Sequence, residues 1–131
     1  IQWKFFKKLN MARKIKLKSF KDERGILTVL DKEIKFKFKR VYYIYDILKK
    51  RGGHRHKKNT QVLIAVNGKC KIFVNDGKNK KNFFLDKKNE CLVLNPRDWH
   101  TIEKFSKDCI LLVLCSEKYQ KKDYIVTPYK N

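Results

Sequence analysis

The stretch Arg51-Gly52-Gly53-His54-Arg55-His56 holds two of the three histidines in the chain. In a β-strand successive side chains point to opposite faces, so His54 and His56 would share one face while Arg55 points to the other. Two imidazoles on one face of a sheet suit either a metal site or an acid/base pair. The third histidine, His100, follows Trp99 in a second turn-to-strand context. We therefore predict that the three histidines meet inside a β-barrel whose interior is an active site.

Downstream of this stretch, short apolar runs alternate with turn residues. Gln61 to Val66 leads into Asn67-Gly68, the strongest hairpin signal in the chain, and we predict a return strand from Lys69 to Asn75. Asn75-Asp76-Gly77 predicts a further turn. Cys109 to Cys115 is almost wholly apolar, which is typical of a strand that is buried on both faces.

Upstream of the histidines, the pattern also favours strands. Asp22-Glu23-Arg24-Gly25 has the composition of a turn, and we expect Ile26 to Leu30 to form a buried strand. Arg40 to Tyr45 is rich in β-branched and aromatic residues, which is typical of a central strand. Within that run we expect Tyr43 and Tyr45 to pack in the core.

The whole pattern predicts an all-β fold. About nine short strands, with no helical run of about ten residues, indicate an antiparallel jelly-roll β-barrel. A chain of 131 residues corresponds to one domain and can bury a core without a disulfide scaffold. We expect residues 12–131 to form that domain. Residues 1–11, which end at the one methionine, are expected to be an N-terminal extension or a cloning remnant.

The composition narrows the classes of partner. The net charge of +21 comes mostly from lysines that are spread through every segment, and no RNP, helix-turn-helix or zinc-finger pattern accompanies them. We therefore predict no nucleic-acid partner, although a positive field would help to capture an anionic substrate. The sequence contains no apolar run of about eighteen residues, so we predict no membrane span. The four cysteines lack a CxxC spacing, which predicts reduced thiols in a cytoplasmic protein.

The spacing of the histidines resembles the cupin double motif. Metal-binding cupins use two histidines, a glutamate four or five residues later, and a histidine from a second motif. Here His54, His56 and His100 match the three histidines, but Gln61 stands at the position of the glutamate. A neutral amide is a poor metal ligand, so we predict no bound metal.

A longer set of segments resembles a more specific family. The segments that carry this resemblance, in chain order, are Asp22-Glu23-Arg24-Gly25, Lys39-Arg40-Val41-Tyr42-Tyr43-Ile44, Arg51-Gly52-Gly53-His54-Arg55-His56, Gln61-Val62-Leu63-Ile64, Asn67-Gly68-Lys69-Cys70, Trp99-His100 and Asp123-Tyr124-Ile125. The set is similar to the nucleotide-sugar 3,4-ketoisomerases, cupin enzymes that act on dTDP-4-keto-6-deoxy-D-glucose. The resemblance implies a reaction without metal or cofactor, a homodimer, and a place in the synthesis of 3-amino-3,6-dideoxy sugars. Gly53 and Arg55 depart from the residues expected there.

The chemistry of such an isomerase agrees with the histidines. Moving a ketone from C4 to C3 requires removal of a proton from C3, an enediol intermediate and return of a proton at C4. Histidine suits both proton transfers because its pKa lies near neutrality. We expect His54 to be the base at C3 and His56 to relay a proton to C4 or between the two oxygens. Tyr42 and Arg40, which share a strand face, would stabilise the oxyanion.

The remaining candidates are residues that would bind the substrate. Arg24 and Arg51 are expected to contact the diphosphate, because a guanidinium pairs with phosphate oxygens in a bidentate manner. Gln61 would hydrogen-bond the sugar or a histidine. Trp99 and His100 would line the cavity.

The residues alone leave two other functions open. One is a non-catalytic cupin that binds a nucleotide sugar, and another is a metal-dependent cupin enzyme. The related 3,5-epimerases use a His–Asp pair, and no aspartate stands out in this sequence as the partner of a histidine. The configuration of an isomerase product at C4, gluco or galacto, is also open.

Overall fold

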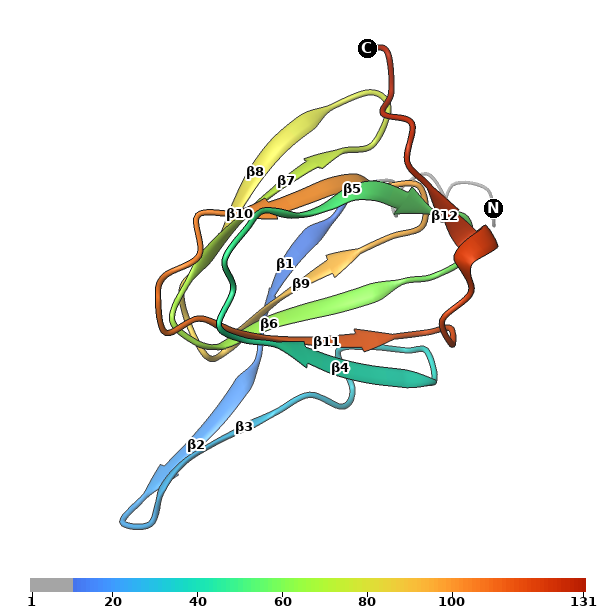
Figure 1. Ribbon diagram of the computed structural model, residues 1–131. Helices are drawn as coiled ribbons and strands as arrows, with labels where there is room; N and C mark the ends of the chain where they lie inside the picture. The colour runs from blue at the N-terminus through green and yellow to red at the C-terminus, as the bar shows by residue number, and fades with distance from the viewer. Residues whose placement is uncertain (1–10) are drawn as a thin grey trace.

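The computed structural model describes residues 11–131, so the extension predicted for residues 1–11 lies outside the described residues except for Met11. Two five-stranded sheets face each other, and all their strand pairs are antiparallel (Figure 1). The prediction of an all-β antiparallel jelly roll is therefore confirmed.

The strands of each sheet come from distant parts of the chain. The first sheet contains, in spatial order, β1 (Arg13–Lys16), β9 (Glu90–Leu94), β6 (Gln61–Asn67), β11 (Ile110–Cys115) and β4 (Arg40–Ile44). The second sheet contains β12 (Tyr124–Ile125), β5 (Arg51–His56), β10 (Trp99–Glu103), β7 (Cys70–Asn75) and β8 (Lys80–Leu85). A separate hairpin is formed by β2 (Lys18–Asp22) and β3 (Gly25–Val29), and a 3₁₀ helix, η1, spans Lys121–Asp123.

The core lies between the two sheets and follows from the two-residue period of the strands. Side chains at alternate positions of β6, β7 and β11 point inward and are completely or almost completely buried, among them Leu63, Ala65, Ile72, Val74, Leu111 and Val113. The outer face of the first sheet is apolar as well, with Val62, Ile64, Cys91 and Val93 in a second buried cluster. The prediction that the β11 region packs on both faces is confirmed, because Leu112 and Leu114 contact this second cluster.

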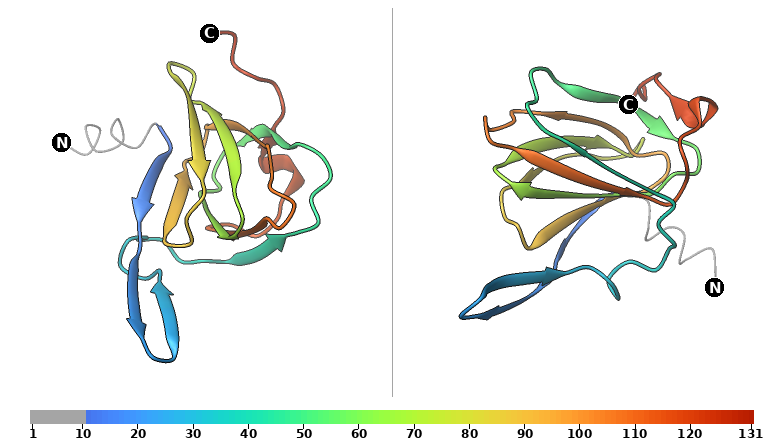
Figure 2. Two further views of the ribbon diagram at one scale, coloured as in Figure 1. Left: turned by 90° about the vertical axis from the view of Figure 1, so that its left-hand side faces the viewer. Right: turned by 60° about the horizontal axis from the view of Figure 1, so that its bottom comes forward.

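The β2–β3 hairpin extends away from the barrel (Figures 1 and 2). Ile26 and Leu27 are 67% and 60% exposed, so the prediction of a buried strand there is wrong. The two strands pair with each other, and within residues 11–131 they join neither sheet. Ile26 and Leu27 are therefore not covered by either sheet of the described part of the chain.

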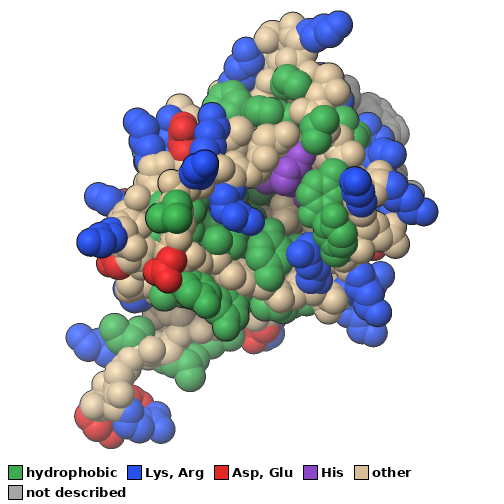
Figure 3. Space-filling model, viewed as in Figure 1, with side chains coloured by type: hydrophobic (Ala, Val, Ile, Leu, Met, Phe, Trp, Pro, Cys, Tyr) green, Lys and Arg blue, Asp and Glu red, His purple; other side chains and the backbone are tan. Residues whose placement is uncertain are grey.

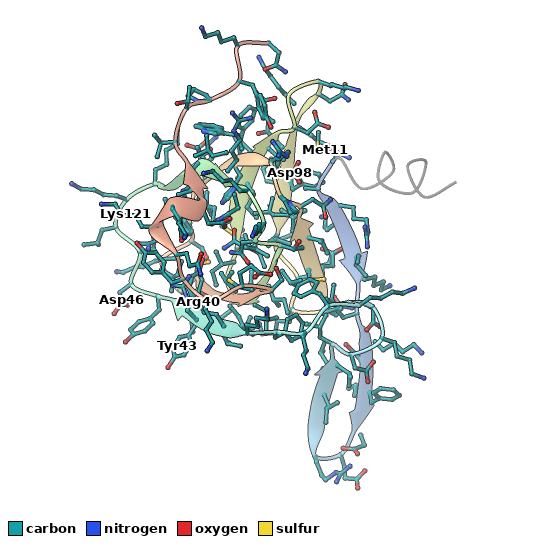
Figure 4. All side chains as sticks on the ribbon, turned by 90° about the vertical axis from the view of Figure 1, so that its right-hand side faces the viewer. Met11, Arg40, Tyr43, Asp46, Asp98 and Lys121 are labelled. Carbon is teal, nitrogen blue, oxygen red and sulfur yellow. The ribbon has the colours of Figure 1, made fainter. Side chains whose placement is uncertain are left out.

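Two further expectations about strand packing are also wrong. Asn67-Gly68 makes a turn, but β6 and β7 belong to different sheets, so the turn passes between sheets and closes no hairpin. Tyr43 is 64% exposed instead of lying in the core, because β4 is an edge strand and Tyr43 is on its outer face, and Tyr45, which follows β4, is likewise 59% exposed. Figure 4 shows Tyr43 pointing away from the barrel. By contrast, the turn at 75–77 does join a hairpin, β7–β8.

Within residues 11–131, η1 is the one helix, and it has three residues. No helix of this part of the chain is long and apolar enough to cross a membrane.

Candidate active site

An open cavity of about 300 Å³ lies between the two sheets at one end of the barrel. Its walls come from β4, β5, β6, β10, β11 and β12, through Arg40, Tyr42, Ile44, Arg51, Gly52, His54, Gln61, Leu63, His100, Ile102, Val113 and Tyr124. Figure 3 shows histidine side chains in a hollow that hydrophobic and basic side chains surround. The cavity thus gathers most of the residues that the sequence predicted for the site.

The glycine pair before the histidines allows β5 to approach β10 closely. Gly52 and Gly53 have φ angles of 86° and 82°, in the left-handed region that favours glycine. A Cβ on Gly52 would lie 2.8 Å from the backbone oxygen of His100. The ladder has a register shift at this point, next to the pairing of His54 with His100. The two glycines therefore place His54 directly opposite His100.

The three histidines converge inside the barrel, as predicted. The ring centroid of His54 lies 5.0 Å from that of His56 and 5.0 Å from that of His100. The rings of His56 and His100 are 6.4 Å apart. His54 and His100 line the cavity, whereas His56 is buried behind them. His54 is thus the member of the HxH pair that a bound molecule can contact.

His56 is paired with Asp123, a residue that the sequence analysis missed as a partner. The Nδ1 atom of His56 lies 2.9 Å from Oδ2 of Asp123, and both side chains are largely buried. A carboxylate accepts a proton donor, so Nδ1 carries the proton and Nε2 has the free lone pair. Nε2 of His56 is itself buried without a hydrogen-bond partner among the described residues. The segment 123–125 was one of the family-like segments, but nothing in the sequence linked it to a histidine 67 positions earlier.

The environment keeps all three histidines neutral near pH 7. Burial, and then the neighbouring His56, lowers the pKa of His54 to about 4. Burial and the proximity of His54 lower the pKa of His100 to about 3. Burial also lowers the pKa of His56, but the carboxylate of Asp123 opposes that shift. Neutral imidazoles can accept a proton, so the cluster is suited to base catalysis.

Tyr42 and Gln61 form a polar pair on the opposite wall. Gln61 Nε2 donates to the hydroxyl of Tyr42 over 3.2 Å and to the sulfur of Cys115 over 3.8 Å. Burial raises the pKa of Tyr42 to about 12, so its hydroxyl stays protonated. Because the hydroxyl accepts from Gln61, its own proton remains available for a substrate oxygen. The guanidinium of Arg40 stacks 4.6 Å from the centre of the Tyr42 ring.

Tyr124 is a second residue that the sequence analysis did not assign to the site. Its ring centroid lies 4.6 Å from that of His54 and 4.5 Å from that of His56. It lines the cavity from β12, the short strand that pairs with β5. The ring thus covers the two histidines of the HxH pair and contributes an apolar surface to their surroundings.

Two of the predicted substrate-binding residues lie away from this cavity. Trp99 alternates with His100 along β10 and therefore faces outward, where its Nε1 donates to the backbone oxygen of Val126 over 3.2 Å. The side chain of Arg24 is 84% exposed on the β2–β3 hairpin and pairs with Asp22. Arg51, in contrast, lines the cavity as predicted. Arg55 points outward, and its guanidinium lies 3.9 Å from the Tyr129 ring centre.

The residues at the cupin metal positions do not form a ligand set. Within residues 11–131, no group of three or more His, Cys, Asp and Glu side chains is arranged to hold a metal ion. Gln61, at the position of the glutamate ligand, hydrogen-bonds Tyr42 instead. That the reaction needs neither metal nor cofactor stays a prediction.

Comparison with known proteins points to one group. The TDP-4-oxo-6-deoxy-alpha-D-glucose-3,4-oxoisomerase of Aneurinibacillus thermoaerophilus is 41% identical over 115 residues, which cover 85% of this chain and 83% of that protein. The structure of WlaRA, a TDP-fucose-3,4-ketoisomerase from Campylobacter jejuni, matches with a TM-score of 0.83 at 38% identity, covering 88% of this chain and 89% of that chain.

A second solved structure is a histidine-to-asparagine variant of QdtA, a 3,4-ketoisomerase from Thermoanaerobacterium thermosaccharolyticum, in complex with TDP-4-keto-6-deoxyglucose. It matches with a TM-score of 0.84 at 38% identity, covering 88% of this chain and 87% of that chain. The family model described as FdtA, WxcM-like, C-terminal, matches residues 10–130. The chain therefore belongs to the FdtA family, and the resemblance to cupin-fold sugar 3,4-ketoisomerases that the ordered segments indicated is confirmed.

Proposed function

We propose that the protein is a sugar 3,4-ketoisomerase that converts dTDP-4-keto-6-deoxy-D-glucose into a dTDP-3-keto-6-deoxyhexose. The observation that carries this proposal is the cluster of three neutral histidines facing a protonated tyrosine across one cavity. The activity printed for the relatives at 38–41% identity supports the same substrate class.

In the first half of the reaction, a proton leaves C3 of the sugar. His54 is the base, because it lines the cavity and its ring is neutral at pH 7. Negative charge then develops on the oxygen at C4. The hydroxyl of Tyr42 donates to that oxygen, and the guanidinium of Arg40 stabilises the charge. The product of this half is an enediol that spans C3 and C4.

In the second half, the enediol takes a proton at C4 and loses the proton of the oxygen at C3. His56 relays a proton through His54, whose ring lies 5.0 Å away, so that the same cluster both removes and returns protons. Overall, protons leave C3 and O3, protons are gained at C4 and O4, and the carbonyl moves from C4 to C3, so substrate and product have the same atoms and no external oxidant is needed.

Basic residues near the cavity suit the diphosphate of the substrate. Arg51 lines the cavity, and a guanidinium binds phosphate oxygens in a bidentate manner. Gln61 and His100 complete the pocket for the sugar. Arg24 lies on the projecting hairpin, so a role for it at a diphosphate requires that the hairpin reach the cavity of a second copy.

A homodimer is part of the proposal. The β2–β3 hairpin exposes Phe20, Ile26 and Leu27, and the outer face of the first sheet exposes Val41 and Tyr43. An apolar hollow of about 280 Å³ lies on the same face of the sheet. An exposed apolar surface of this extent is typical of an interface between protein chains. A monomer in sedimentation at micromolar concentration would contradict this part of the proposal.

The proposed substrate and the free thiols support a proposed pathway and compartment. A 3-keto sugar is the substrate that an aminotransferase needs to place an amino group at C3, which suits the synthesis of 3-amino-3,6-dideoxy sugars. All four cysteines are buried free thiols, as expected for a protein that works in the reducing cytoplasm.

The test is to follow C3 and C4 of dTDP-4-keto-6-deoxy-D-glucose by proton NMR in D2O with chelator-treated protein. We expect a 3-keto product that carries deuterium at C4, and the coupling at C4 will give its configuration. A folded protein that binds the nucleotide sugar but yields no exchange and no product would favour a binding protein over an enzyme.

A further inference from the structure

Residues 119–131, which we call the C-terminal strap, cross the open end of the barrel and continue over its second sheet (Figures 1 and 2). We propose that this strap is a positioning element for catalysis, in which Asp123 holds His56 in one tautomer and Trp99 and Tyr129 fix the strap from the outer face. The proposal rests on the proposed isomerase function and adds residues that do not touch the substrate.

The first step of the argument is that Asp123 is held rigidly. Its carboxylate accepts from the backbone N–H of Lys58 over 2.8 Å, in addition to its contact with His56. Its backbone oxygen accepts from the N–H of Lys57 over 2.9 Å, and its own N–H donates to Gln120 over 3.0 Å. These bonds fix the carboxylate in front of Nδ1 of His56. The proton of His56 therefore resides on Nδ1, and Nε2 remains free to exchange a proton.

The second step is that the strap contacts the same histidine twice. Directly after Asp123, the strap becomes β12, in which Tyr124 pairs with His56 and Ile125 pairs with Arg55. The Tyr124 ring lies 4.5 Å from the His56 ring and closes it off from solvent. A displacement of the strap would therefore remove both the carboxylate partner and the apolar cover of His56.

The third step is that contacts on the outer face hold the rest of the strap. Beyond β12, residues 126–131 belong to neither sheet. Trp99 Nε1 donates to Val126, and the hydroxyl of Tyr129 donates to the backbone oxygen of Arg97 over 2.7 Å. Arg55 stacks on the Tyr129 ring, and the side chains of Asn75 and Asn131 exchange two hydrogen bonds.

The outer-face contacts explain two residues that the cavity does not use. Trp99 was expected in the cavity but faces outward, and Arg55 lies between the histidines but points away from them. Each neighbours a histidine in sequence and contacts the strap with its own side chain. Because side chains alternate between the two faces of a strand, the neighbour of a cavity-facing histidine points outward, and in β5 and β10 that neighbour contacts the strap.

Asp123→Asn tests the strap at its centre, with Glu117→Gln as the matched control. Glu117 borders the same surface hollow as Asp123 and pairs with Lys39, so the control loses a carboxylate charge without a contact to a histidine. We expect Asp123→Asn to lower kcat about 100-fold with little change in KM. Because the carboxylate raises the pKa of His56, the acid limb of the kcat profile should move to lower pH. Glu117→Gln should match the wild type in both measurements.

Tyr129→Phe and Trp99→Phe test the outer-face anchors. Each removes a single hydrogen bond that lies outside the cavity, so we expect a smaller loss of kcat, about 3-fold to 10-fold, with the acid limb displaced in the same direction. The 15N NMR signals of the His56 ring report the tautomer directly and need no substrate. We expect a protonated Nδ1 in the wild type and a mixture of tautomers in Asp123→Asn.

A failure of the strap proposal gives a different result from a failure of the isomerase proposal. Wild-type kcat and pH profile in Asp123→Asn, or an unchanged His56 tautomer, would overturn the strap proposal and leave the isomerase proposal intact. Absence of turnover in the wild type would instead overturn the proposed function, and the NMR measurement would still decide the role of Asp123.

Discussion

The C-terminal strap and the β2–β3 hairpin both extend beyond the barrel, but among residues 11–131 the strap pairs with a sheet strand and the hairpin strands do not (Figures 1 and 2). Side-chain hydrogen bonds, a cation–π contact and a strand pair hold the strap in place. In the described part of the chain, β2 and β3 pair with each other and with neither sheet, and Ile26 and Leu27 are exposed.

The two segments therefore serve different purposes. Directional polar contacts fix the position of a few atoms, which suits a segment that orients a catalytic histidine. Apolar contacts depend mainly on buried area, which suits a segment that binds another surface. The contacts of the strap lie within one chain, whereas the exposed apolar side chains of the hairpin suit the dimer interface that we propose.

The largest expected effect comes from His54→Asn, which tests whether the cavity below the strap is the reaction centre. Loss of the base should lower kcat about 1,000-fold or more, while binding of TDP should stay within about 3-fold of the wild type. Turnover measured by NMR and TDP affinity measured by calorimetry provide the check. A variant that keeps wild-type turnover would move the reaction centre away from His54, and the strap would then lose its proposed target.

The double variant Ile26→Glu with Leu27→Glu tests the hairpin. Both side chains are exposed in the single chain, so we expect little change in its melting temperature at a concentration where it is monomeric. The dissociation constant of the dimer should rise about 100-fold or more, because each dimer would bury charges in place of apolar groups. Analytical ultracentrifugation over a range of concentrations measures it. An unchanged dimer would show that the hairpin lies outside the interface.

The exposed hairpin also shows which features of the fold the sequence alone predicts. The two-residue period correctly placed His54 with His56, and Arg40 with Tyr42, on the inner face. Burial of Ile26 and Leu27 was predicted wrongly, because apolar character alone does not place a side chain in the core.

Contacts between distant segments were the hardest to predict. Asn67-Gly68 forms the predicted turn, but the strands on either side, β6 and β7, pair with strands of different sheets. The pairing of Asp123 with His56 joins residues 67 positions apart, and no local pattern marks it. The ordered segments identified the family, yet the roles of Asp123, Tyr124 and Trp99 required the three-dimensional arrangement.

Arg51→Ala and Arg24→Ala extend the comparison to substrate binding. Arg51 lines the cavity of its own chain, so its loss should raise KM about 10-fold with a smaller effect on kcat. Arg24 lies on the hairpin, so its loss should raise KM only if the hairpin reaches the cavity of a second copy. Steady-state kinetics of the two variants decide between these cases. A wild-type KM for Arg24→Ala in a dimer would restrict the diphosphate contacts to arginines of the same chain.

Asp98 offers a third kind of contact, inside the turn that precedes His100. Its Oδ2 accepts from the N–H of Asn95 over 2.9 Å, while Oδ1 is buried without a partner among the described residues. Burial raises the pKa of this carboxyl from 3.8 to about 7. The folded state therefore binds a proton more tightly than the unfolded state does.

Ionisation of Asp98 is expected to lower the free energy of unfolding. The stabilisation that comes with the protonated Asp98 is fully present below pH 3.8 and is lost as the pH rises through about 7, where the buried carboxyl must ionise. Asp98→Asn stays neutral and keeps an oxygen for the Asn95 N–H. We expect the variant to gain about 2 kcal/mol over the wild type at pH 8 and much less at pH 5, measured by urea unfolding at both values. If the difference in unfolding free energy between the variant and the wild type is the same at both pH values, Asp98 does not titrate in this range. Its hydrogen bond to the turn would then stabilise the barrel independently of pH, as the neutral hydrogen bonds of the strap do.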